Sequence, residues 1–224
     1  MPSWVGPVAE YMAREGLVTT LKIAGLSVLG SAVVGIVLGT LLTIDFLPSR
    51  GLIRLYIEVW RGLPILVTIF IIFFVLPSYE IRFTPVISGS IGLTLWGSAQ
   101  VAEATRGAVV SIPREQHEAA AAVGFGWVGS HAYVILPQAL RRLLPPLVSL
   151  LVNVIQNSTL VALIGGIELL QAGKLQIEGL QLPPPTGIGE LHAFEIYGAV
   201  LGAFFCISFP LTRLAAHLEK RLVV

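Results

Sequence analysis

Five long apolar segments constrain the fold of this chain more than any other feature of its sequence. They cover residues 17–44, 54–76, 86–110, 143–165 and 194–214. About 20 apolar residues are enough for a helix to cross the hydrocarbon core of a bilayer, where every backbone N–H and C=O group needs an internal partner. Only 12% of the residues are charged, against roughly 25% in soluble domains. The sequence therefore predicts an all-α integral membrane protein, with five transmembrane helices in a single domain of residues 1–224.

Composition also excludes several kinds of function. The formal net charge is +1, without the clustered basic residues that nucleic-acid binding requires. The single cysteine cannot form a disulfide within the chain, and no Cys or His spacing suggests a metal site. Gly173-Lys174 lacks the first glycine and the following hydroxyl residue of a nucleotide-binding phosphate loop. We expect no catalytic residue, no metal and no cofactor in this chain.

The first apolar segment carries glycines at spacings of four or five residues, namely Gly25, Gly30, Gly35 and Gly39. Small residues at such intervals leave one side of a helix nearly bare, so that another helix can approach closely. The general tolerance of membrane helices for glycine is the alternative explanation. We expect this side of the helix to be a packing face.

The polar connection 111–142, between the third and fourth apolar segments, contains a predicted short helix. Pro113 suits a first helical position, and the alanines that follow Glu118 present small side chains that another backbone can approach. Gly124 is expected to end this helix. The connection is therefore a loop with a helix in it.

A known motif matches this connection. Glu118, Ala119 and Ala120, then Gly124, then Leu136-Pro137 resemble the EAA loop of ABC importer permeases. Any alanine-rich helix can contain Glu-Ala-Ala, but here the glycine and Leu-Pro follow in register between two apolar segments. The resemblance implies the type I ABC importer permease fold. It also implies that these six residues form a cytoplasmic coupling helix and its flank, which dock into a cleft of a separate ATP-hydrolysing subunit.

Further segments resemble polar amino-acid permeases of the histidine and glutamine type. Arg61-Gly62-Leu63-Pro64 is similar to their Arg-Gly-Thr-Pro, although an interfacial anchor made by Trp60 and Arg61 would explain the same residues. Gln156-Asn157-Ser158-Thr159 is similar to their Lys-Asp-Thr-Ser, with amides in place of both charged residues. The resemblance implies import of a polar amino acid. An opine or another small amino-acid-like solute is the alternative substrate.

Polar residues inside the apolar segments are candidates for specific roles. Glu103 and Arg106 are three residues apart, share a helix face and are expected to form a structural ion pair. Other uncharged polar groups need partners away from lipid, and we expect them beside the substrate pathway. These residues are Gln100, Gln156, Asn157, Ser158 and Thr159. Hydrogen bonding between neighbouring helices is the alternative role.

Basic residues predict the orientation. With five spans and the connection 111–142 in the cytoplasm, ten Lys and Arg residues lie on the cytoplasmic side and four outside. The ten are Arg50, Arg54, Arg61, Arg106, Arg114, Arg141, Arg142, Arg213, Lys220 and Arg221, and the four are Arg14, Lys22, Arg82 and Lys174. We expect a multi-pass protein of the bacterial inner membrane, with its N-terminus outside and its C-terminus in the cytoplasm.

The family resemblance also implies partners. They are a dimer of ABC ATPase subunits that bind ATP and Mg, a second permease subunit in a homo- or heterodimer, and a periplasmic or lipid-anchored amino-acid-binding protein. Membrane lipids surround the complex, and no nucleic-acid partner is expected. A secondary transporter would be the main functional alternative, but no internal repeat relates the first spans to the last. A membrane enzyme is disfavoured because the four histidines are scattered.

Overall fold

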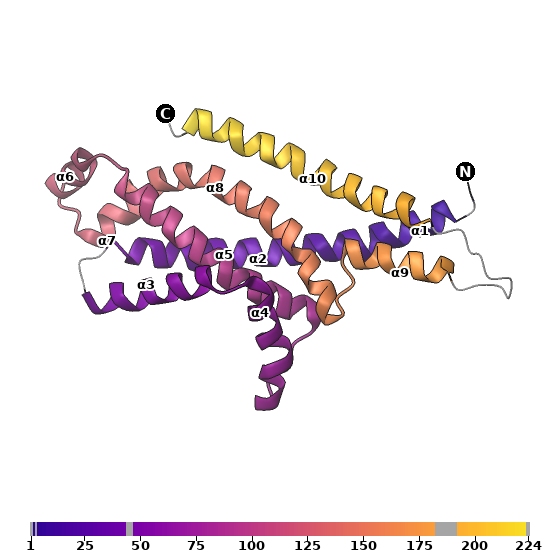
Figure 1. Cartoon of the computed structure of the whole chain (residues 1–224). Coiled ribbons are helices and arrows are strands. Elements are labelled where there is room, and N and C mark those ends of the chain that lie inside the picture. Colours follow the sequence, from indigo (N-terminus) through magenta and orange to yellow (C-terminus); the bar gives the residue numbers. More distant parts are fainter. Residues whose placement is uncertain (1, 3, 44–46, 182–191, 223–224) are drawn as a thin grey trace. The chain divides into compact units, whose positions relative to one another are not determined.

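The computed structural model describes residues 2, 4–43, 47–181 and 192–222, and all regular elements in this part of the chain are helices (Figure 1). They are α1 (Val5–Tyr11), the π-helical η1 (Met12–Leu17), α2 (Val18–Leu41), α3 (Leu47–Gly62), α4 (Ile65–Phe70), the π-helical η2 (Ile71–Val75), the 3₁₀ helix η3 (Leu76–Tyr79), α5 (Pro85–Val110), α6 (Arg114–Ala122), α7 (Trp127–Gly129), the π-helical η4 (Ser130–Ile135), α8 (Leu136–Asn157), the 3₁₀ helix η5 (Ser158–Ile164), α9 (Leu169–Gln181) and α10 (Ala193–Leu222). The all-α prediction is confirmed.

Within the described residues, three helical stretches are long and apolar enough to cross a membrane, namely 5–41, 127–164 and 193–222. A broken helix, 50–62 with 65–79, raises the number to four if it forms one span. Pro64 lies at the break, where its missing N–H removes a helical hydrogen bond. With its 26 residues α5 is long enough for a fifth span, but it carries serines, Glu103 and Arg106, which lower its apolar character. Five spans therefore remain a prediction.

Two connections between the predicted spans contain more helix than expected. Residues 127–142, expected as part of a loop, continue the helical path from α7 through η4 into α8. The proline-rich connection after the fourth span contains the helix α9, which uses the mixed apolar and polar residues before the prolines. Residues 182–191 of that connection lie outside the described part.

The chain forms two compact units. The first contains Met1–Ser27, Ile65–Leu93 and Val152–Pro210, and the second contains Val28–Pro64, Thr94–Leu151 and Leu211–Val224. The helices α2, α5, α8 and α10 each contribute residues to both units.

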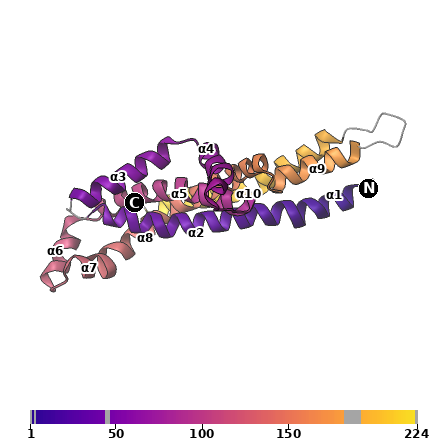
Figure 2. The ribbon, with the colours of Figure 1, turned by 90° about the horizontal axis from the view of Figure 1, so that it is seen from below.

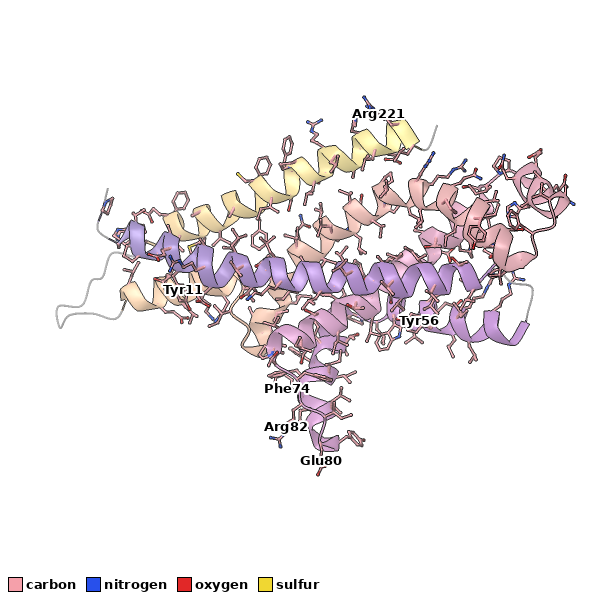
Figure 3. All side chains as sticks on the ribbon, turned by 180° about the vertical axis from the view of Figure 1, so that it is seen from behind. Tyr11, Tyr56, Phe74, Glu80, Arg82 and Arg221 are labelled. Carbon is pink, nitrogen blue, oxygen red and sulfur yellow. The ribbon has the colours of Figure 1, made fainter. Side chains whose placement is uncertain are left out.

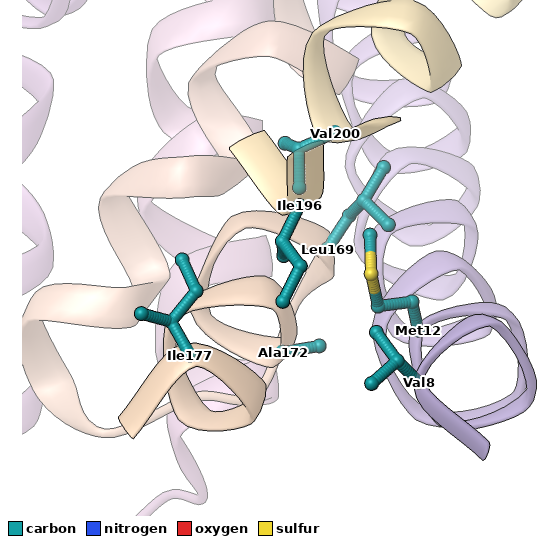
Figure 4. Packing of buried hydrophobic residues seen from close by; sticks show 7 residues of the cluster. All are labelled: Val8, Met12, Leu169, Ala172, Ile177, Ile196 and Val200. Carbon is teal, nitrogen blue, oxygen red and sulfur yellow. The ribbon is translucent and has the colours of Figure 1, made fainter. Parts of the chain in front are cut away.

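In the first unit, α9 packs between the N-terminal helix and the start of α10. Val8 and Met12 contact Ala172 and its neighbours, and Ile196 of α10 closes the cluster (Figure 4). Burying apolar side chains of this kind is worth about 1.5–3 kcal/mol each in water. The Thr20 hydroxyl also accepts a hydrogen bond from the backbone N–H at the start of α9, with 3.1 Å between Leu169 N and Thr20 Oγ1.

In the second unit, α2 and α5 pack closely through the predicted glycine face. A Cβ atom added to Gly30, Gly35 or Gly39 would lie closer than 3.0 Å to atoms of α5. The packing prediction is confirmed for these three glycines. It is wrong for Gly25, because no neighbouring atom lies within 4 Å of a Cβ built there.

Candidate coupling segment and polar sites

Helix α6 forms where the sequence predicts it, and its end is a defined hydrogen-bonded motif. Gly124 N–H donates to Ala121 O at 3.0 Å, and Phe125 N–H donates to Ala120 O at 3.1 Å. This pair of bonds is a Schellman cap, which requires a left-handed residue just after the helix. Gly124 meets that requirement with φ of +87°. At the other end Pro113 is the N-cap rather than the first helical residue, because its ψ of 143° is not helical.

Most of α6 and the turn after it are exposed. Ala120 is buried, whereas Glu118 and Ala119 face solvent, and Glu118 pairs with Arg114 at 2.9 Å along the helix. Apolar side chains nearby are also exposed, with Val123 at 73% and Tyr133 at 75%. Helix α6 and α7 lie side by side at one end of the second unit (Figure 2). We name the exposed residues of this region, 114–133, the coupling segment.

A buried cluster lies on both sides of the coupling segment in sequence. It contains Ala108 and Val109 of α5, Ile112 two residues after α5, Ile135 of η4, and Ala139 and Leu143 of α8. Leu136 and Pro137, predicted as part of the coupling loop, are the first two residues of α8. The Leu-Pro motif thus lies where the π-helical η4 passes directly into α8.

His131 is a buried polar residue in this region that the sequence analysis missed. Its ring stacks on Trp127 with 4.0 Å between centroids. Nδ1 lies 3.0 Å from Trp127 O, and Nε2 lies 3.3 Å from Thr43 Oγ1 near the end of α2. Because a carbonyl oxygen only accepts, Nδ1 must carry the proton of the first bond. The helical spacing of Trp127 and His131 was the only sequence signal for this contact.

Glu103 and Arg106 contact each other as their spacing predicts. Arg106 Nε donates to Glu103 Oε1 at 3.0 Å, and Nη2 donates to the same oxygen. The side chains are 37% and 35% exposed, and they line a cavity of about 280 Å³ with Arg54, Glu58 and Arg61. The pair is thus half-buried at the edge of a polar cavity, and its structural role remains a prediction.

The polar residues at the end of α8 bond mainly to their own helix. Asn157 Nδ2 donates to Asn153 O at 2.8 Å, Ser158 Oγ to Ile155 O at 2.7 Å, and Thr159 Oγ1 to Gln156 O at 2.8 Å. The helix tightens from α to 3₁₀ geometry at Ser158, and it stays so for seven residues, longer than is usual. Gln156 is exposed and Ser158 is buried. These four residues belong to the first unit, whereas Gln100, which is partly buried in α5, belongs to the second.

Glu168 is a second buried group that the sequence analysis did not identify. Its carboxylate accepts hydrogen bonds from Leu170 N at 2.9 Å and Gln171 N at 2.8 Å, so it caps the N-terminus of α9. Burial raises the pKa of the Glu168 carboxyl, and the two backbone N–H groups act in the opposite direction. Among the described residues, no group of three or more His, Cys, Asp or Glu side chains could hold a metal ion.

The described residues thus form a helical membrane chain with an exposed, capped helix between long apolar helices. The chain belongs to the family of binding-protein-dependent transport system inner membrane components, whose model matches residues 31–224. It is therefore a multi-pass inner-membrane permease, and the permease is the non-enzymatic membrane subunit of such systems.

Several relatives match nearly the whole chain. The chain is 34% identical over 212 residues to the glutamine transport system permease protein GlnP of Escherichia coli K12, covering 94% of this chain and 92% of that protein. It is 29% identical over 211 residues to the probable glutamine ABC transporter permease protein GlnM of Bacillus subtilis 168, covering 94% and 93%.

Solved structures confirm the type I ABC importer permease fold. One, described as an amino acid ABC transporter with histidines, superposes with a TM-score of 0.80 at 26% identity, covering 96% of this chain and 95% of that one. A chain of the MetNI methionine ABC transporter in an inward-facing conformation gives a TM-score of 0.72 at 18% identity, covering 95% and 98%.

Proposed function

We propose that this chain is the transmembrane subunit of an ATP-driven importer that carries a polar amino acid, received from a solute-binding protein. The relatives named above as glutamine permeases and the structural neighbour described as an amino acid transporter support this substrate class. An opine or another small amino-acid-like solute is the second candidate.

The observation that carries the proposal is the exposed coupling segment. An exposed helix with alanine side chains, flanked by exposed Val123 and Tyr133, offers a close-approach surface and apolar anchors to another protein. The sequence lacks a phosphate-binding loop, so the ATPase must be a separate subunit that binds ATP and Mg. The buried cluster around Ile112, Ile135 and Leu143 joins the end of α5 to the start of α8, and Ile112 lies two residues before α6, so a movement of α6 would reach both helices.

The substrate pathway is proposed to run beside Gln156, Asn157, Ser158 and Thr159, and Gln100 of the second unit is a separate candidate for a substrate contact. After its bond to Asn153 O, the Asn157 amide retains one N–H donor and its oxygen acceptor. Uncharged groups of this kind can replace water around an amino acid's carboxylate and ammonium groups. The irregular 3₁₀ stretch that begins at Ser158 is consistent with a site where the helix must open toward a ligand.

The partners and orientation follow from the same proposal. A second permease subunit would complete the pathway, two ATPase subunits would bind the two coupling segments, and the binding protein would dock on the opposite side of the membrane. The C-terminus and the coupling segment would lie in the cytoplasm, and the N-terminus outside, as the ten-to-four distribution of basic residues favours.

The test is reconstitution of the permease with its ATPase and binding protein, followed by ATPase and uptake assays screened over amino acids. We expect one or a few polar amino acids to stimulate ATP hydrolysis and to accumulate. Ala119→Arg adds bulk and charge on the exposed face of α6 and should release the ATPase, whereas Ala216→Arg at an exposed position of α10 should not. Uptake driven by an ion gradient without the ATPase would instead support a secondary transporter.

A further inference from the structure

Three arginines converge on a small cavity in the second unit that the proposed transport cycle does not use. The cavity has a volume of about 260 Å³, and its lining residues are Gln138, Arg141, Arg142, Arg221 and Leu222. Two of the arginines are near the start of α8, and Arg221 is at the far end of α10 (Figure 3). Among the described residues that line the cavity there is no carboxylate.

The cavity is partly preorganised. Arg142 Nη1 donates to the Ser111 backbone oxygen at 2.8 Å and to its hydroxyl oxygen at 2.6 Å, which holds one edge of this guanidinium. Gln138 Nε2 donates to Val134 O at 2.9 Å and to Gln116 Oε1 at 3.2 Å. These bonds fix two lining side chains on their scaffold and leave most of the guanidinium N–H groups available.

The other two arginines have no counterion in the described part of the chain. Neither Arg141 nor Arg221 forms an ion pair or a side-chain hydrogen bond there. Three like charges around one cavity repel each other, and a bound anion would remove that repulsion. The planar guanidinium fork matches the oxygen atoms of carboxylate and phosphate groups, and a phosphate group offers more oxygen atoms to donors that come from three arginines.

The surroundings of the cavity favour a lipid as the source of the phosphate. Leu140 and Leu144 of α8 are exposed beside Arg141, and Leu214 is exposed two turns before Arg221 on α10. Both helices belong to stretches apolar enough to cross a membrane. A basic cavity next to exposed leucines at the ends of such helices suits a molecule with an anionic head and apolar chains. The volume equals that of about nine water molecules, enough for a phosphate group with part of a glycerol.

We propose that this arginine pocket binds the phosphate group of an anionic phospholipid, from the leaflet on the side of the coupling segment. The pocket contacts that segment through Gln138, which bonds Gln116 within α6. Arg142 bonds Ser111, three residues before α6. A bound lipid would therefore brace the base of the coupling helix. This consequence for transport rests on the proposed function, whereas lipid binding itself does not.

The test measures binding of phosphatidylglycerol and phosphatidylcholine to the purified, detergent-solubilised permease by native mass spectrometry. We expect retention of phosphatidylglycerol, and at least a tenfold loss of its affinity in the double variant Arg141→Gln, Arg221→Gln. Arg82→Gln removes one exposed charge that does not line the pocket, and it should change the affinity less than twofold. Arg221→Lys keeps the charge but loses the fork, and it should give an intermediate affinity.

Two results would overturn the proposal. One is unchanged phosphatidylglycerol affinity in the folded double variant, or in Arg221→Gln alone if the double variant does not fold. The other is inorganic phosphate that competes for the pocket as strongly as the lipid does, which would assign it to a free anion. The two proposals fail independently, because the experiment measures lipid binding and not transport. A permease that does not bind phosphatidylglycerol could still be an importer, and a permease without amino-acid uptake could still bind the lipid.

Discussion

Gly124 allows the coupling helix to be perturbed without disturbing the packing of the chain. Its φ of +87° is in the left-handed region, and an L-residue with a Cβ there costs about 1–2 kcal/mol. A Cβ at this position would meet no atom within 4 Å, so the cost comes from the backbone and not from a collision. A penalty of about 1.4 kcal/mol lowers the equilibrium constant for the closed helix end about tenfold.

We expect Gly124→Val to open the cap, and with it the hydrogen bonds from Gly124 N–H to Ala121 O and from Phe125 N–H to Ala120 O. The chain should still insert, because the spans are unchanged. Substrate uptake and the stimulation of ATP hydrolysis by loaded binding protein should fall at least tenfold. Gly124→Asn should retain most of both activities, because asparagine tolerates the left-handed region.

The assay compares uptake, stimulated ATPase activity and co-purification of the ATPase in one reconstituted preparation. Gly107→Ala is the matched control, since Gly107 is also free of neighbours within 4 Å but lies inside α5 without a positive φ. Normal uptake by Gly124→Val, with the ATPase bound as in the wild type, would refute the coupling assignment. Equal defects in Gly124→Val and Gly124→Asn would refute the backbone explanation and leave the bulk of the side chain as the cause.

Four further predictions test other parts of the structure. Glu103→Ala should lower the yield of folded protein and cost about 1 kcal/mol, since its pair with an arginine is only half-buried; unchanged stability with altered substrate preference would place the pair in the pathway. Asn157→Leu should give an assembled complex with changed selectivity or uncoupled ATP hydrolysis, and unchanged uptake would remove this amide from the pathway. Burial raises the pKa of the Glu168 carboxyl in the folded state above its unfolded value. The contribution of this carboxyl to the free energy of unfolding is therefore fully present below the unfolded pKa and is lost as the pH rises through the folded pKa. Thermal unfolding of Glu168→Gln, measured between the unfolded and the folded pKa of Glu168, should not show this loss of stability with rising pH. The same pH dependence of stability in Glu168→Gln and in the wild type would contradict the role given to Glu168. Gly39→Ala should cost about 1–3 kcal/mol through collision with α5, whereas Gly25→Ala, which has no neighbour within 4 Å, should be neutral within about 0.5 kcal/mol.

The sequence by itself determined the features that depend on local composition and short-range spacing. Apolar length predicted the helices at 5–41, 127–164 and 193–222, which are long and apolar enough to cross a membrane, because burial in lipid acts on each segment separately. The helix before Gly124 and its end were predictable, because capping needs only a few consecutive residues. The bond between Glu103 and Arg106 followed from one turn of helix, and the EAA spacing indicated the family.

Only the tertiary structure decided which residues far apart in the chain meet. His131 and Thr43 are 88 residues apart, and nothing local to either predicts their contact. Glu168 is buried because α9 packs against the N-terminal helix, a contact that the polar and proline-rich composition around α9 concealed. The four glycines are spaced at four or five residues and look alike in sequence, yet a Cβ built on Gly30, Gly35 or Gly39 would collide with α5, whereas one built on Gly25 would meet no atom within 4 Å. The arginine pocket likewise joins residues of α8 and α10 that are 80 positions apart, Arg141 and Arg221, since side-chain convergence depends on where whole helices pack.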